Sequence, residues 1–133
     1  MQDRPDAGIL LDAIQDFLIK EVMPFVKEND ALSYKTLVSW NMLGVVSREL
    51  KYGEQKLNEE INRLSAYLKT NTSINSHTNY PQKMEICREL NQQFSNQIKE
   101  QKLSLRNTEA WNLAKKSLEE KIEISNPRFQ KGD

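Results

Sequence analysis

The chain has 133 residues, which at roughly 100–200 residues per domain predicts one domain over residues 1–133. Its 19 basic and 19 acidic side chains cancel, and this balance argues against a nucleic-acid-binding protein, which needs a basic surface to displace counterions from phosphates. A mean hydropathy of −0.73 and the absence of about 18–20 consecutive apolar residues predict a soluble protein with no membrane-spanning helix.

Acidic residues are concentrated near the start of the chain. Residues 1–30 hold seven acids and three bases, a net charge of −4, whereas residues 31–53 have a net charge of +2. The acidic segment is interpreted either as the solvated face of a helix or as a docking surface for a basic partner. The first residues lack the basic and apolar regions of a signal peptide, and a single cysteine suits a reducing compartment, so we expect a cytoplasmic protein.

The first predicted helix begins at Pro5–Asp6, where the Asp6 carboxylate can accept hydrogen bonds from the free N–H groups of the first turn. We expect this helix to end or kink near residues 21–23, because Pro24 clashes with the preceding turn. Apolar residues at steps of one, three and four form one apolar face: Ile9, Leu10, Ala13, Ile14, Phe17, Leu18 and Val22.

The second predicted helix runs from about Leu32 to Tyr52, and its segment TLVSWNMLGVV is apolar nearly all round. A helix of this kind normally lies in the centre of a bundle. We expect Gly53 to end it in a left-handed conformation. A third helix then begins near Glu54 and carries an apolar seam spaced by four, three and four: Leu57, Ile61, Leu64 and Leu68.

Residues 70–81 are rich in Asn, Ser and Thr and predict a polar loop. A fourth helix is predicted from about Gln82 to Gln101, and a fifth follows a break near 103–108 and ends at Asn126–Pro127. The fold class is therefore all-α, a single-domain bundle of about five helices. The predicted stripes of the last two helices are Met84, Cys87, Leu90, Phe94 and Ile98, and Trp111, Ala114, Leu118 and Ile122.

Common catalytic and cofactor-binding motifs are absent, including G-x-G-x-x-G, the P-loop, H-E-x-x-H, C-x-x-C and G-x-S-x-G. His77, the only histidine, is interpreted as a solvated loop residue rather than a catalytic base. Cys87 is interpreted as a core residue rather than a reactive thiol. Acid pairs such as Glu59–Glu60 and Glu119–Glu120 are placed on polar helix sides, without the E-x-x-H of dinuclear sites. We therefore expect no metal and no cofactor, and a non-catalytic protein is favoured over an enzyme.

Three polar residues of the second helix, Tyr34, Asn41 and Arg48, are seven apart and so share one face. Asn41 has aliphatic neighbours there, which predicts a buried, hydrogen-bonded amide, because an unsatisfied one costs about 1–3 kcal/mol. This face is either a structural network that fixes helix packing or the wall of a polar pocket. Glu49 lies about 100° from Arg48 around the helix, so we expect it to find a separate partner.

Two arginines near the chain ends, Arg4 and Arg128, each adjoin a proline. We expect each to tie its end of the chain to the bundle through hydrogen bonds to carboxylates or helix-end carbonyls. Binding of a ligand anion is the alternative.

The motifs DRPDA, LLDAIQDFL, EVMP, WNMLGVVSREL and NPRF together resemble a family of small bacterial proteins of unknown function. In many genomes that family is encoded beside aminoglycoside-phosphotransferase-like kinases and acyl-CoA dehydrogenases. The chain has Ser39 and Trp40 where the family usually has small alanines. The family pattern falls on Arg4, Pro5, Leu11, Pro24, Asn41, Arg48, Glu49, Asn126, Pro127 and Arg128.

Two functional hypotheses follow from these observations. The resemblance and the missing motifs favour a non-catalytic accessory or binding protein that acts with a kinase-like or acyl-CoA dehydrogenase partner. The alternative is a small-ligand-binding protein or minor enzyme that uses the polar face around Asn41 and Arg48. A homo-oligomer is left open.

Overall fold

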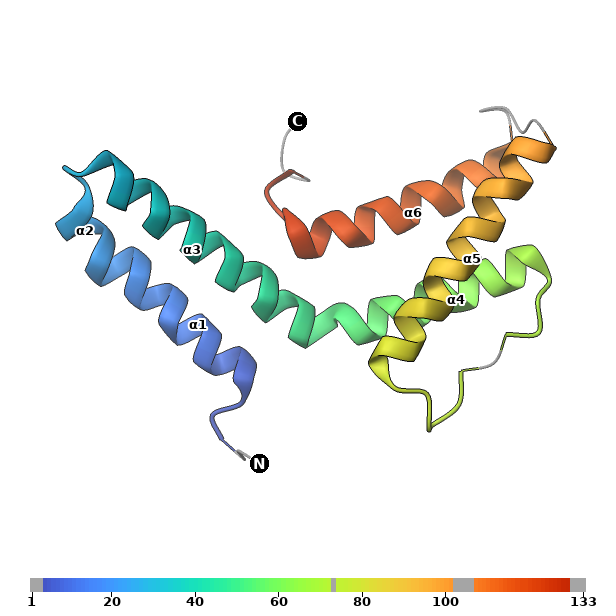
Figure 1. Ribbon diagram of the computed structural model, residues 1–133, viewed down its shortest axis with the longest axis horizontal. Coiled ribbons are helices and arrows are strands. Elements are labelled where there is room, and N and C mark those ends of the chain that lie inside the picture. The colour runs from blue at the N-terminus through green and yellow to red at the C-terminus, as the bar shows by residue number, and fades with distance from the viewer. Residues whose placement is uncertain (1–3, 73, 102–106, 130–133) are drawn as a thin grey trace. The chain divides into compact units, whose positions relative to one another are not determined.

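The computed structural model describes residues 4–72, 74–101 and 107–129 (Figure 1). Within these ranges the chain is helical and contains no strand, which confirms the predicted all-α class. The helices join into four uninterrupted segments over the described residues, 7–26, 30–68, 80–100 and 108–125, where we expected about five. The elements are α1 (Ala7–Phe17), η1 (Leu18–Val22), α2 (Met23–Val26), α3 (Asp30–Arg48), η2 (Glu49–Gly53), α4 (Glu54–Leu68), α5 (Tyr80–Glu100) and α6 (Thr108–Ser125).

The start of the first segment matches the prediction, but the helix does not end near residues 21–23, where a π-helical turn meets a new α-helical turn. The Asp6 carboxylate accepts a hydrogen bond of 2.9 Å from the backbone N–H of Ile9 and so caps α1. The segment continues past Pro24 because the π-helical turn η1 precedes it and α2 begins with Pro24 in its first turn. A proline is tolerated there, since the first N–H groups of a helical turn need no partner.

Gly53 does not end a helix, so the predicted boundary at this residue is wrong. No glycine among the described residues has a positive φ, and the π-helical turn η2 carries the chain from α3 into α4. A Cβ atom on Gly53 would lie 2.6 Å from Oε1 of Glu49. The glycine therefore leaves room for the Glu49 carboxylate, one turn earlier in the helix.

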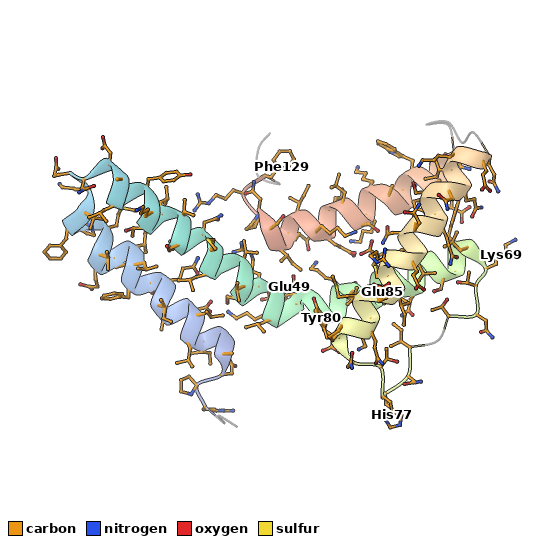
Figure 2. All side chains as sticks on the ribbon, in the orientation of Figure 1. Glu49, Lys69, His77, Tyr80, Glu85 and Phe129 are labelled. Carbon is orange, nitrogen blue, oxygen red and sulfur yellow. The ribbon has the colours of Figure 1, made fainter. Side chains whose placement is uncertain are left out.

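The residue that ends this long segment is Lys69, which has a φ of 55° and is labelled in Figure 2. The N–H of Thr70 donates to the carbonyl of Ser65 at 3.1 Å, and the N–H of Lys69 donates to that of Ala66 at 3.3 Å. These two bonds are the Schellman pattern that commonly terminates a helix, here with lysine in the place usually taken by glycine.

The described chain divides into two compact units. The first contains residues 4–53 with 124–126, and the second contains residues 54–123 with 127–129. The single domain expected from the length concerns both units together and stays a prediction.

The second unit holds the buried apolar core, which α4 and α5 supply through the predicted seams. Tyr67 packs edge-on against Phe94 with 5.3 Å between ring centroids. Three predicted stripe residues, Met84, Trp111 and Leu118, are exposed instead, so the stripes of α5 and α6 were placed partly wrongly. The buried apolar residues are Leu57, Ile61, Leu64, Cys87, Leu90, Phe94 and Ala110.

The first unit is a helical hairpin in which α1 packs on α3 through small residues. Gly8, Gly44 and Ser47 are buried there, and a Cβ atom on Gly8 would lie 2.9 Å from the Lys51 side chain. Since α3 packs on α1 along this one narrow strip, the prediction of a centrally buried second helix is wrong. Large exposed side chains of α3 are Leu32, Tyr34, Leu37, Val38, Met42 and Val46.

Candidate functional site

The predicted polar face of α3 exists, but it is not buried. Tyr34 is 69% exposed and Asn41 is exposed, so the prediction of a buried amide at Asn41 is wrong. The reason is the orientation of α3: its Ser47 side packs on α1, and Asn41 points about 120° away from Ser47 around the helix. We call Tyr34, Val38, Asn41 and Met42 the Asn41 face, since the spacing i, i+4, i+7, i+8 places them together.

Arg48 is engaged in holding a helix end. Its Nε donates a hydrogen bond of 2.6 Å to the carbonyl oxygen of Ile124, which lies in the last turn of α6. Carbonyls of a last turn lack a partner within the helix, and a cation near them also interacts favourably with the helix dipole. The sequence analysis expected a hydrogen bond from a guanidinium to a helix-end carbonyl at Arg4 and Arg128, and the structure shows such a bond at Arg48.

The remaining candidates lie at the surface. Arg4, Glu49 and Arg128 are exposed, and both Glu49 and Arg128 have interaction partners. The predicted ties of Arg4 and Arg128 to the bundle stay predictions.

Polar contacts fix α1 against α3 on one side of the hairpin. The Asp12 carboxylate accepts a hydrogen bond of 2.6 Å from the Ser47 hydroxyl and forms an ion pair with Lys51. The bonds from Lys51 and Ser47 lower the pKa of Asp12 below its usual value. The side-chain amide of Gln15 donates to the carbonyl of Trp40 at 2.9 Å. These groups satisfy one another and hold the hairpin together.

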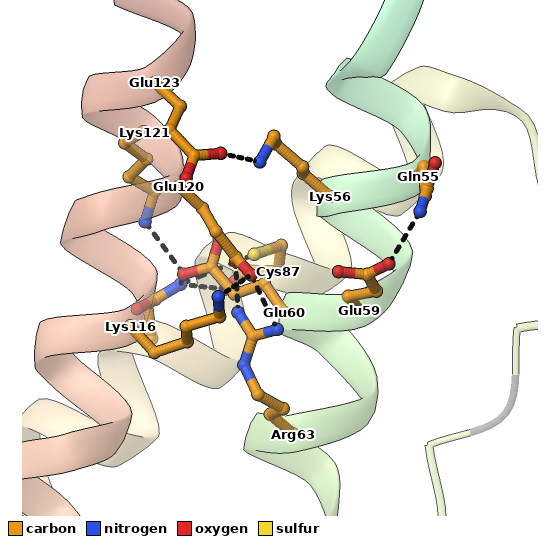
Figure 3. A network of polar contacts seen from close by, with 11 residues as sticks. Gln55, Lys56, Glu59, Glu60, Arg63, Cys87, Lys116, Glu120, Lys121 and Glu123 are labelled. Carbon is orange, nitrogen blue, oxygen red and sulfur yellow. Dashed lines mark hydrogen bonds and ion pairs between the residues drawn. The ribbon is translucent and has the colours of Figure 1, made fainter. Parts of the chain in front are cut away.

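A second polar network lies in the other unit, around two buried carboxylates (Figure 3). Glu60 accepts hydrogen bonds from Lys121 at 2.8 Å and Asn91 at 3.2 Å. Burial raises the pKa of Glu60, but the bonds from Lys121 and Asn91 outweigh it and leave the pKa below its usual value. Both terminal nitrogens of Arg63 donate hydrogen bonds to the Glu120 carboxylate. The network joins α4, α5 and α6 and is structural.

Sequence reasoning missed this network, because it placed Glu60 and Glu120 on polar helix sides. Both are buried, with 6% and 5% of their surface exposed. The available signal was that Glu60 directly precedes the seam residue Ile61. A carboxylate that is buried beside such a seam needs a basic or hydrogen-bonding partner.

Cys87, weighed as a reactive thiol, and His77, weighed as a catalytic base, have the positions that the sequence predicted. Cys87 lies in the core, and burial together with the adjacent charge of Glu60 raises its pKa to about 12. Such a thiol is not a nucleophile near neutral pH. His77 is exposed on the loop between α4 and α5 (Figure 2). In the described part of the chain, no three His, Cys, Asp or Glu side chains are placed to hold a metal ion.

Exposed apolar side chains are the feature that distinguishes the first unit. Thirteen of the seventeen large hydrophobic residues found exposed in the described chain lie between Ile9 and Tyr52. Single exposed apolar residues are ordinary, but a contiguous patch marks an interaction surface. None of the helices that the structure describes is long and apolar enough to cross a bilayer.

A family model described as a domain of unknown function (DUF6285) matches residues 27–129, from the turn before α3 to just beyond α6. No curated protein and no solved structure matches the chain. The match includes Asn41, Arg48 and Arg128 and confirms the resemblance to a family of unknown function. Since the matched range covers most of its length, the chain belongs to the DUF6285 family.

Proposed function

We propose that this protein is a non-catalytic accessory protein that binds a partner protein through the Asn41 face of α3. The observation that carries the proposal is the exposure of this face: Tyr34 is 69% and Met42 is 62% exposed. Tyrosine and methionine are enriched where proteins bind one another, and charged residues are depleted there. The four residues of the Asn41 face are uncharged, and Arg48 lies on the same side of α3.

The position of Asn41 supports a protein partner. An exposed amide among apolar residues can pair with backbone groups of a docking chain, which fixes register while Tyr34 and Met42 supply buried area. Arg48, which lies on the same side of α3 as Asn41, already serves the fold, since it bonds to the carbonyl of Ile124. The family resemblance suggests a kinase-like protein or an acyl-CoA dehydrogenase as the partner.

The proposal is tested by measuring binding of the purified chain to each of these two proteins by biolayer interferometry. The variant Met42→Glu places a charge on the Asn41 face, and Met84→Glu is the matched control on exposed α5 surface. We expect binding that Met42→Glu abolishes and Met84→Glu retains, with both variants folded by circular dichroism. No complex at micromolar concentrations, or equal binding by the two variants, would refute the proposal.

The alternative, a small-ligand-binding protein or minor enzyme that uses Tyr34, Asn41, Arg48 and Glu49, is tested in the same preparation. A thermal-shift screen would include acyl-CoA, nucleotides and aminoglycoside-like sugars. A ligand at 100 times its Kd adds about 2.7 kcal/mol to stability. A shift that Asn41→Leu removes would favour this alternative over the accessory function.

A further inference from the structure

The helix α6 has an uncovered apolar side, which is the stripe that the sequence predicted for it. Trp111, Ala114, Leu118 and Ile122 follow one another at steps of three, four and four. This is the spacing of helices that pack side by side along their length. The four residues lie within about 80° of one another around a single helix, so they face in one direction. We call them the Trp111 seam.

The Trp111 seam points away from the rest of the second unit. Ser117 and Glu120 of α6 are buried, and Glu120 accepts hydrogen bonds from Arg63 of α4, so they mark the side on which α6 packs. Trp111 lies about 120° from Ser117 and about 180° from Glu120 around the helix. Trp111 is 51% and Leu118 is 58% exposed.

The segment that follows α6 extends this apolar surface. Phe129, which is 69% exposed, lines a groove together with Leu118 and Ile122, and Lys115 and Glu119 line the same groove. The helix and the segment after it therefore form one contiguous apolar surface with charged residues beside it. A surface of this kind on a folded chain marks an interaction site.

We propose that this surface binds a second copy of itself, so that the α6 helices of two chains pack antiparallel about a twofold axis level with residues 116–117. This axis sets Trp111 of each copy against Ile122 of the other, and Ala114 against Leu118. The larger side chain of each pair thus meets a smaller one, as the interdigitation of packed helices requires. The twofold axis makes the two halves of the contact identical.

Charge selects the antiparallel arrangement. Lys115 and Glu119 lie on the same flank of the seam, about 40° and 80° from Trp111 around the helix. An antiparallel twofold pair brings like flanks together in reverse order, so Lys115 of each copy meets Glu119 of the other. The two side chains are about half exposed and 3.8 Å apart within one helix, and both are accessible to a second copy. A parallel pair would instead stack Trp111 on Trp111 and lose both of these ionic contacts.

The size of the surface sets the strength of the dimer. The helix α6 has 18 residues and is about 27 Å long, so at a width of about 10 Å its flat footprint is on the order of 300 Å². Interdigitating side chains and Phe129 add to this area, whereas stable dimers bury about 800 Å² on each partner. We therefore expect a weak, reversible dimer that forms at high micromolar concentrations.

The first test is sedimentation equilibrium of the full chain at concentrations up to several hundred micromolar. The mean mass should rise from 15.5 kDa toward twice this value. Leu118→Glu should remain monomeric and folded by circular dichroism, whereas Met84→Glu, on exposed surface of α5, should dimerise as the wild type does. A wild-type chain that stays monomeric, or a Leu118→Glu variant that dimerises like the wild type, would overturn the proposal.

The second test concerns the arrangement of the two helices. Lys115→Glu and Glu119→Lys should each raise the dimer Kd by about tenfold, because each places like charges opposite one another twice in every dimer. An equimolar mixture of the two variants should dimerise with nearly the wild-type Kd, since each variant supplies the charge that the other needs. A mixture that dimerises no better than either variant alone would overturn the antiparallel arrangement.

The dimer surface is separate from the Asn41 face, which lies on α3. Met42→Glu should therefore dimerise as the wild type does, even though we expect it to abolish binding of the partner protein. Loss of the dimer in Met42→Glu would place the contact on α3 and overturn the proposal. Loss of partner binding in an intact dimer would refute only the proposed function.

Discussion

Cys87 should react with thiol reagents at least about a thousandfold more slowly in the folded protein than in the unfolded chain. Only the thiolate reacts, and burial together with the neighbouring Glu60 carboxylate raises the pKa of Cys87 from 9.0 to about 12. At pH 8 the thiolate fraction then falls from about one tenth to about one ten-thousandth. Cys87 is also only 6% exposed, which slows the reaction further.

The assay follows the colour released by Ellman's reagent at pH 8, with and without urea. Glu60→Gln removes the neighbouring negative charge, so the pKa of Cys87 should fall and the folded-state rate should rise. Glu85→Gln, on exposed surface of the same helix α5, is the control and should leave the rate unchanged. A folded protein whose Cys87 reacts within tenfold of the unfolded chain would refute the description of this buried cluster.

Three further predictions concern stability, each measured by urea denaturation. The pKa of Glu60 is lowered on folding, so its contribution to the free energy of unfolding is full above pH 4.5, the usual pKa, and is lost as the pH falls through the lowered pKa. Glu60→Gln should therefore make the free energy of unfolding fall less steeply at acid pH. An unchanged fall would contradict the assignment. Arg48→Met removes the bond to Ile124 and should cost about 1–3 kcal/mol, whereas a cost near zero would show that the bond is not formed in solution. Leu64→Ala opens a cavity at a fully buried site and should lower the free energy of unfolding by about 2–5 kcal/mol. Leu118→Ala, at an exposed site, should lower it by less than about 1 kcal/mol. Similar losses for the two variants would contradict the placement of the core.

The sequence predicted correctly the features that depend on neighbouring residues, such as a helix cap and a buried helix seam. Asp6 caps α1 because its carboxylate meets free N–H groups within the same turn. The seam of Leu57, Ile61 and Leu64 is buried because its spacing places three apolar side chains on one side of α4. These outcomes depend on residues within one or two turns of each other, so the chain sequence contains the needed information.

Other features depend on hydrogen-bond register or on distant residues, and the sequence did not reveal them. A glycine at position 53 fits both a left-handed helix end and a π-helical turn, and the chain adopts the second. Burial of Glu60 depends on Lys121, which lies far along the chain. Likewise, the sequence around Asn41 would show the same apolar pattern whether another part of the chain or another protein covered this helix.

Oxidation of methionine by hydrogen peroxide, followed by mass spectrometry, tests the central claim most directly, namely that α3 presents a protein-binding face. Met42 is 62% and Met84 is 49% exposed, so both should oxidise readily in the protein alone. When the proposed partner, a kinase-like protein or an acyl-CoA dehydrogenase, is added, Met42 should be protected severalfold and Met84 should oxidise at its former rate. Oxidation of Met42 at the same rate with and without both partners would contradict the claim.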